Sequence, residues 1–423
     1  MFKNKRAALA AGAIVAATLV AGTIPAEATG SSTLKVGIVL PLTGGNSKYG
    51  VGIAHAAQMG VADVNAAARA AGLTAKCQLV GTEDDQDTTA GAVEATNKLI
   101  KSSGAQVIVG GGMKSSIALV LANSVTIPAN VPMIGVTSSS PLLSSLNDHD
   151  TYFRVYPSDN FQATALVKAM SKAFGSSAKI NVGSRNDAFG TGLANAFAKQ
   201  WKANGGTIGA NINWDPNASS LDSQAAKLAA GSPDGWLIVD YDTGMAKLAP
   251  GLVKAGGWDA KKTFMTEDLN NAAAIATVEK VVPGVMEGIR GTSGSSLGVS
   301  TDAWAKKKAA AYPSDAPTFA DATGYDAAVL ACLANIEAQG SGTSFFTRAI
   351  RRVSGPAGTQ YTWQQLDKAV VAASKHVSFS YMGAWGEAAF DKNGDTGAGK
   401  FDVYKIHAGQ AVINPADTLT FSS

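Results

Sequence analysis

Residues 34–66 read LKVGIVLPLTGGNSKYGVGIAHAAQMGVADVNA, and this stretch decides the fold. A run rich in β-forming residues, Leu34–Leu40, meets Pro41 and a Thr-Gly-Gly turn. Apolar or small residues then recur at the spacing of a helix packed on a sheet, at Ile53, Ala57, Gly60, Val61 and Val64. Such a unit places free backbone N–H groups at the carboxyl edge of a parallel sheet, where α/β folds bind small ligands.

The segment in front of this unit has the parts of a secretory signal peptide. Three basic residues within Met1–Arg6 precede an apolar, uncharged run, Ala7–Ile24, and a small-x-small site predicts cleavage after Ala28. An uncleaved membrane anchor is the alternative, but the run is rich in Ala and Gly and barely long enough to span a bilayer. The signal peptide predicts an exported protein, periplasmic or extracellular. Because no cysteine lies near the cut, we expect no lipid anchor.

The length of the remaining chain, about 395 residues, favours two lobes, because it exceeds what a single hydrophobic core usually supports. Without residues 1–28, Lys and Arg total 32 and Asp and Glu total 31. No basic field for nucleic acid and no acidic tail is present. The two cysteines, Cys77 and Cys332, leave a disulfide and two buried thiols equally open, because sequence does not show whether their Cα atoms come within about 7 Å.

Strand-like and helix-like runs alternate from Lys35 to Met265, which predicts parallel sheets with helices on both faces. We expect strands at 77–81, 106–109, 131–136, 179–182, 209–214, 236–240 and 263–265. We expect helices at 89–101, 115–124, 161–174, 191–204, 219–230 and 245–255, the third capped by Ser158 or Asp159. Further helices are expected at 301–312, 319–338, 343–353 and 363–373, and then a hairpin over 383–406 around Asp391–Asp395.

The opening wording, V-G-I-V-L-P-L-T-G…Y-G, and six later segments resemble the branched-chain (Leu/Ile/Val) amino-acid-binding proteins of ABC importers. The later segments occur in the family's order: Thr82–Asp87, Val131–Gly135, Tyr152–Arg154, Asn186–Leu193, Gly324–Ala327 and Phe390–Asp395. The resemblance covers most of the chain after the leader. It implies an α/β fold of the type I periplasmic-binding-protein kind, in which two lobes each hold a mainly parallel sheet flanked by helices.

By the same resemblance, lobe 1 comprises residues 33–153 and 290–378, and lobe 2 comprises 154–289 and 379–423. Three hinge crossings would then lie near Phe153–Pro157, Gly288–Gly291 and Val377–Tyr381.

A site for a zwitterionic amino acid needs neutral donors around the carboxylate. Ser115 and Ser116 begin a predicted helix, and Thr137 and Ser139 follow a predicted parallel strand. Hydroxyls and helix N-terminal N–H groups suit a carboxylate. Helix capping and a polar connection are the alternative explanations. The resemblance implies that all four positions contact the α-amino and α-carboxyl groups.

The ammonium end needs an acid, and the resemblance implies that Asp268 supplies it after a lobe 2 strand. Glu267 is the rival, and a surface acid is the alternative for either. Relatives often have glycine where this chain has Leu269. A buried, unpaired carboxylate is costly, so the role makes sense only if the cleft closes around the ammonium.

The resemblance implies an aromatic wall formed by Tyr49, Phe189 and Tyr241, for which core packing is the alternative. Relatives often have Tyr at the Phe189 position. Lys114 also departs from the family, which has a small polar residue there; it either points to solvent or meets a second acidic group on the ligand.

Signals for catalysis or metal binding are poor. Gly110–Gly112 lacks the spacing of a nucleotide fingerprint, and the four histidines lack metal spacing. Asp391, Asn393 and Asp395 mimic a calcium loop, but Thr396 replaces its glycine and Asp402 its glutamate. The acidic run 83–85 reads as a solvated loop, with Gln86 and Asp87 as possible cleft residues. We expect no enzyme, cofactor or metal.

We therefore expect a monomer that captures an amino acid, or an amino-acid-like or amide compound, by hinge closure and delivers it to an ABC permease. A ligand-sensing subunit for a membrane receptor is the alternative. An exported hydrolase is disfavoured because no nucleophile–base motif occurs.

Overall fold

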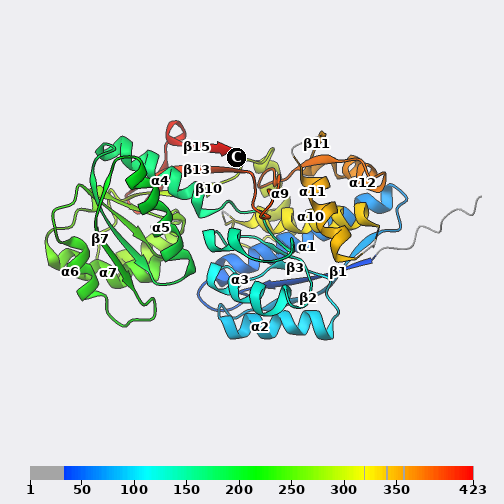
Figure 1. Cartoon of the computed structure of the whole chain (residues 1–423), viewed down its shortest axis with the longest axis horizontal. Coiled ribbons are helices and arrows are strands. Elements are labelled where there is room, and N and C mark those ends of the chain that lie inside the picture. The colour runs from blue at the N-terminus through cyan, green and yellow to red at the C-terminus, as the bar shows by residue number, and fades with distance from the viewer. Residues whose placement is uncertain (1–32, 319, 340–341, 356–357, 423) are drawn as a thin grey trace, which may run out of the picture.

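The computed structural model describes residues 33–318, 320–339, 342–355 and 358–422, which form two α/β lobes side by side (Figure 1). The expected signal peptide, residues 1–28, lies outside the described residues. Within the described ranges, no helix is long and apolar enough to cross a membrane.

The first lobe is built on a five-stranded parallel sheet in the order β2-β1-β3-β4-β5. Its strands are β1 (Thr33–Leu40), β2 (Lys76–Asp84), β3 (Val107–Gly110), β4 (Met133–Gly135) and β5 (Tyr152–Arg154). Its helices from the same part of the chain are α1 (Ser47–Ala70), α2 (Thr89–Asn97) and α3 (Ser115–Leu121). The core strands are fully buried because helices cover both faces of the sheet.

Later helices complete this lobe: α9 (Thr301–Ala311), α10 (Asp321–Ala338), α11 (Thr343–Ser354) and α12 (Leu366–Ser374). The buried stripe of α1, which includes Ile53, Ala57 and Val64, belongs to the same apolar cluster as almost the whole of α10. Two short strands, β11 (Thr359–Thr362) and β12 (Phe379–Met382), pair in parallel with each other.

The second lobe contains an eight-stranded sheet in the order β14-β13-β10-β9-β8-β6-β7, with β15 also paired to β13. Its strands are β6 (Lys179–Arg185), β7 (Thr207–Trp214), β8 (Gly235–Val239), β9 (Thr263–Met265), β10 (Arg290–Ser295), β13 (Ala398–His407), β14 (Gln410–Ile413) and β15 (Leu419–Ser422). The flanking helices are α4 (Asp159–Phe174), α5 (Ala188–Ala203), α6 (Asp222–Ala229), α7 (Asp242–Ala255) and α8 (Ala272–Glu279). Two apolar clusters pack against this sheet. The expected two-lobed type I fold class is thus confirmed.

Several local expectations are also decided. Ser158, not Asp159, caps α4, because its hydroxyl accepts the N–H of Asn160.

The expected hairpin over 383–406 is wrong: only residues 398–407 form a strand there, and the hairpin partner of this strand is β14. Backbone N–H groups of 384–386 instead donate to the buried carboxylate of Asp326, which leaves them unavailable for strand pairing.

The crossing segments also differ in place from the expectation. β10 pairs with β9 and β13 and so lies in the second sheet, although residue 290 was the expected start of the return to lobe 1. β12 pairs with β11 beside the first lobe, so the third crossing follows Met382. The first and third crossings are joined by buried Arg154, whose Nε donates to Asp395 over 2.6 Å.

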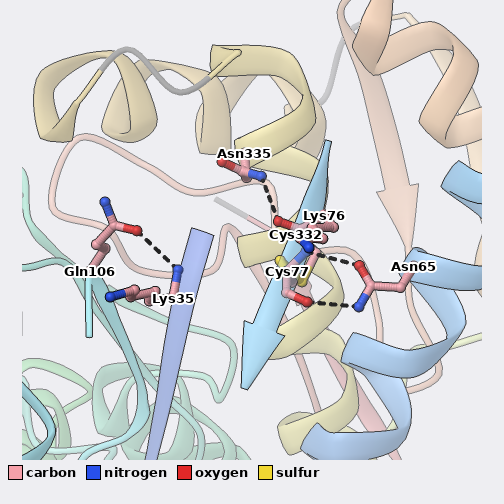
Figure 2. Close-up of a disulfide and its surroundings, with 7 residues drawn as sticks. All are labelled: Lys35, Asn65, Lys76, Cys77, Gln106, Cys332 and Asn335. Carbon is pink, nitrogen blue, oxygen red and sulfur yellow. Dashed lines mark hydrogen bonds between the residues drawn. A yellow bond between two sulfur atoms is a disulfide. The ribbon is translucent and has the colours of Figure 1, made fainter. Parts of the chain in front are cut away.

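Cys77 and Cys332 form a disulfide, with their Cα atoms 5.8 Å apart. The bond joins the start of β2 to α10, segments separated by 255 residues (Figure 2). The amide of Asn65 on α1 both donates to and accepts from the backbone of Cys77 at 2.8 Å, which fixes the edge strand beside the two helices. This arrangement settles the alternatives that the sequence left open.

Candidate functional site

A small cavity of about 50 Å³ lies where the two lobes meet. The first lobe and the crossing after β5 contribute Asn46, Tyr49, Met113, Ser115, Thr137, Ser139 and Tyr156, and the second lobe contributes Phe189, Tyr241, Glu267 and Asp268. Most of these residues follow the carboxyl ends of parallel strands, which is where the opening unit led us to expect a ligand. The structure brings seven of the eight predicted site residues together here.

Ser116 is the predicted site residue that does not line the cavity. Ser115 is buried and faces the cavity, whereas Ser116 is the next residue of α3 and is only half-buried. Successive side chains on a helix with 3.6 residues per turn point about 100° apart, so both hydroxyls cannot face one cavity.

The hydroxyl-lined end of the cavity has defined donors and acceptors. Ser115 Oγ accepts the backbone N–H groups of Ser139 and Ser140, at 3.2 and 3.1 Å. Because these bonds occupy its lone pairs, its own O–H remains able to donate. Thr137 Oγ1 donates to the carbonyl of Met113 at 3.2 Å, which leaves its lone pairs able to accept.

Two adjacent acids of the second lobe also line the cavity. Asp268 Oδ1 accepts the phenol O–H of Tyr49 at 2.9 Å, and its Oδ2 accepts the N–H of Asp242 at 2.8 Å. Glu267 Oε2 accepts from Gln162 Nε2 at 2.7 Å. Burial raises the pKa of both Glu267 and Asp268, and the charge of Lys48 partly offsets the rise for Asp268. A cationic group placed between these carboxylates would favour their ionised forms.

A further acid lies close to both Ser139 and Glu267. Asp159, the first residue of α4, is fully buried, and its N–H donates to the carbonyl of Ser139. Burial, then the charge of Glu267, raises the pKa of Asp159 well above its ordinary value. Burial and the nearby charge of Glu267 thus both disfavour the ionised form of Asp159.

Contacts across the cleft hold the two lobes together in this structure. Tyr49 from α1 reaches Asp268, and the neighbouring Lys48 Nζ lies 3.3 Å from Asp242 Oδ2. Ser140 Oγ donates to the carbonyl of Ala188 at 2.7 Å. The cavity is thus enclosed by polar contacts that form only when the lobes meet.

The aromatic side chains form one wall. The rings of Phe189 and Tyr241 stack with centroids 5.5 Å apart and planes 7° apart. The guanidinium of Arg185 lies 4.2 Å from the Tyr241 centroid and is itself fixed by Asp187 and Asp240. The Tyr241 ring is therefore in contact with both Phe189 and Arg185.

Sequence reasoning missed Asn46, Met113 and Tyr156 as lining residues. Asn46 could have been found, because it ends the Gly-rich turn that the sequence singled out, and its Nδ2 donates to Asp87 Oδ1 at 3.0 Å. Tyr156 stacks on Trp385 with centroids 5.4 Å apart, a contact between remote segments that no local pattern signals.

The expectations for Lys114 and for the acidic run were wrong. Lys114 Nζ pairs with Asp87 Oδ2 at 2.8 Å, so it neither points freely to solvent nor lines the cavity. Asp84 accepts the N–H groups of Leu42 and Thr43, which orders the first loop.

Asp85, in the same run, is fully buried, and burial raises the pKa of Asp85 to about 7. Within the described ranges, no group of three or more His, Cys, Asp or Glu side chains is placed to hold a metal ion.

Comparison with known proteins agrees with this geometry. The model of the periplasmic binding protein family matches residues 33–410. The chain belongs to this family. Its members are substrate-binding proteins of transporters.

A curated relative, the Leu/Ile/Val-binding protein BraC3 of Rhizobium johnstonii, is 24% identical over 383 residues, covering 90% of this chain and 93% of its own. The expected resemblance to branched-chain amino-acid-binding proteins is therefore confirmed.

Solved structures share the fold at lower identity. The leucine-binding protein LivK of Thermotoga maritima superposes with a TM-score of 0.70 at 18% identity, covering 92% of this chain and 99% of its own. LivJ of Streptococcus pneumoniae, solved in complex with isoleucine, gives a TM-score of 0.66 at 18% identity, covering 90% and 100%.

Proposed function

We propose that this protein captures a small amino acid, or an amide of similar size, outside the membrane and delivers it to an ABC permease. The observation that carries the proposal is the polarity of the cavity: the first lobe lines it with hydroxyl groups and the second lobe with two carboxylates. A zwitterion matches this arrangement in one orientation only. The leader-like segment and the family both support export.

The carboxylate of the ligand would lie against Ser115, whose free O–H can donate, with Thr137 and Ser139 beside it. The ammonium would lie at Glu267 and Asp268. We assign the stronger contact to Glu267, because Asp268 already accepts hydrogen bonds on both oxygens whereas one bond to Glu267 is seen.

The size of the cavity favours a small side chain. One water molecule needs roughly 10–15 Å³ on this scale, so 50 Å³ accommodates about four water-sized groups. Glycine, alanine and short amides fit better than the side chains of the relatives' ligands, leucine and isoleucine. The rings of Phe189 and Tyr241 would cover the side chain.

The mechanism would be closure of one lobe on the other. Ligand contacts from both lobes exist together only in the shut form, so binding shifts the population toward it. Lys48 and Tyr49 would add contacts to the shut form that do not require the ligand. A monomer suffices, since both halves of the site belong to one chain.

A thermal-shift screen tests the proposal. A panel of amino acids, amides, sugars and metal salts would be followed by calorimetry on each hit. An amino acid or amide at 100-fold excess over its Kd should stabilise the protein by about 2.7 kcal/mol. A shift from sugars or metals, with none from the amino acids and amides, would refute the proposed ligand class.

A further inference from the structure

A second cavity, of about 310 Å³, is lined by residues of α4, of strands of the second sheet and of the segment that leads into β15. Figure 1 shows α4 and β15 in the second lobe. The volume of this cavity falls in the range of small-molecule sites. Lys168 and Lys172 on its wall are nine and thirteen residues beyond Asp159, which marks the cleft end of α4. At 1.5 Å per residue they lie about 13 and 20 Å along the helix from that end, so this cavity is separate from the cleft.

The lining combines positive charge with an apolar floor. The charged residues are Lys168, Lys172, Arg290 and the acid Asp417, and the apolar ones include Phe264, Val403 and Leu419. Lys172 is paired with Asp417 at 2.5 Å, which leaves the remaining two cations in excess. The cavity therefore offers positive charge at its wall and apolar surface beneath it.

Arg290 is the most informative of these residues. It is half-buried, and its guanidinium lies 4.5 Å from the ring centroid of Phe264 and 5.2 Å from that of Phe174. One N–H donates to the carbonyl of Lys261, but no carboxylate in the described part of the chain pairs with Arg290. Burial accordingly lowers the pKa of Arg290. A half-buried cation without an anion carries a desolvation cost that a bound anion would offset.

Lys168 also lines this cavity, at an exposed position on α4. Its ammonium lies 4.6 Å from the ring centroid of Phe421, and within the described ranges it has no carboxylate partner. Arg290 and Lys168 each lie over an aromatic ring, and both line a cavity that also has apolar lining residues. This arrangement matches a ligand with an anionic head and an apolar body.

We propose that this cavity binds an organic anion with an apolar tail. Arg290 and Lys168 would contact the head, which is a carboxylate or a phosphate ester, and Phe264, Val403 and Leu419 would contact the tail. This site is independent of the amino-acid site proposed for the cleft.

Calorimetry with octanoate, octyl phosphate, octylammonium and inorganic phosphate tests the proposal. The two octyl anions distinguish a carboxylate from a phosphate head, and either should bind with 1:1 stoichiometry. Arg290→Met keeps an unbranched apolar side chain but removes the guanidinium, so affinity should fall about tenfold or more. Lys168→Met, an exposed position, serves as a second variant if Arg290→Met does not fold.

Arg69→Met, at an exposed position near the end of α1, is the matched control and should bind as the parent does. Glu267→Gln, in the cleft, should also leave octyl-anion binding unchanged; tighter binding by this variant, from which a repelling negative charge has been removed, would place the anion in the cleft and overturn the proposal. It would likewise be overturned if neither octyl anion bound, if octylammonium or inorganic phosphate bound as tightly, or if both cavity variants kept full affinity.

Discussion

Replacing Glu267 by Gln tests which of the two adjacent acids receives the ligand's ammonium. The substitution keeps the length of the side chain and one carbonyl oxygen to accept from Gln162 Nε2, a bond of 2.7 Å in the structure. It removes only the negative charge. The lobes and the aromatic wall should therefore be preserved.

The magnitude follows from the surroundings of the carboxylate. Glu267 is half-buried, burial raises its pKa, and it lines the cavity. Losing one partner of such a desolvated charge pair costs about 2–5 kcal/mol of binding free energy. The Kd measured by calorimetry should therefore rise roughly 30- to 4,000-fold.

Asp268→Asn is the matched control at the neighbouring position. Its oxygens are occupied by Tyr49 and by the N–H of Asp242, so its loss should weaken ligand binding by only about 1 kcal/mol. The reverse order of the two effects would refute the reasoning and give the ammonium to Asp268, as the sequence alone implied.

Binding should also depend on pH through Glu267. Burial raises the pKa of this carboxyl without ligand, and an ammonium would lower it again. Affinity should therefore rise with pH through the raised pKa, and binding should release protons. Calorimetry in two buffers of different ionisation enthalpy measures this release, which Glu267→Gln should abolish; proton uptake would contradict the assignment.

Three further outcomes follow from other parts of the structure. Replacing both Cys77 and Cys332 by Ser should lower the free energy of unfolding by up to about 5 kcal/mol in denaturant titrations, because the disulfide closes a loop of 255 residues. An unchanged unfolding midpoint would show that the disulfide does not restrict the unfolded chain. Burial raises the pKa of Asp85 to about 7, so the stability that comes from its protonated form is complete below about pH 4 and is lost as pH rises through 7. Asp85→Asn should therefore raise the melting temperature at pH 8 but not at pH 5. Equal shifts at the two pH values would argue against burial of Asp85 as the cause. Small-angle X-ray scattering should show a smaller radius of gyration with ligand than without it. Tyr49→Phe removes the hydrogen bond to Asp268 across the cleft, so it should enlarge the radius of the ligand-free protein. An unchanged radius at saturating ligand would mean that closure does not accompany binding.

Much of the fold could be predicted from local patterns. The period of apolar residues located α1, α5 and α10 to within a few residues, because each buries a continuous stripe against a sheet or helix. The short strands β5 and β10 and the helix α8 were not predicted. β10 contains Gly291, Gly294 and three hydroxyl residues, so only its pairing with β9 and β13 makes it a strand.

The candidate site divides in the same way. Ser115, Thr137 and Asp268 could be placed from sequence because each follows a parallel strand, and all such ends meet at one edge of a sheet. Tyr156 and the bonding of the two acids could not, because they depend on segments that are remote in the chain.

The sequence by itself determined the alternation of strands and helices, the two-lobed class and the edge at which a ligand would bind. The alternation and the edge depend on local periodicity and on turn chemistry, which neighbouring residues supply, whereas the two lobes follow from the length of the chain and from its family resemblance. Tertiary structure alone decided that Cys77 and Cys332 bond, that Lys114 pairs with Asp87, and that Tyr49 reaches Asp268. Each of these contacts joins residues brought together only when the sheets and lobes pack, so no local pattern specifies it.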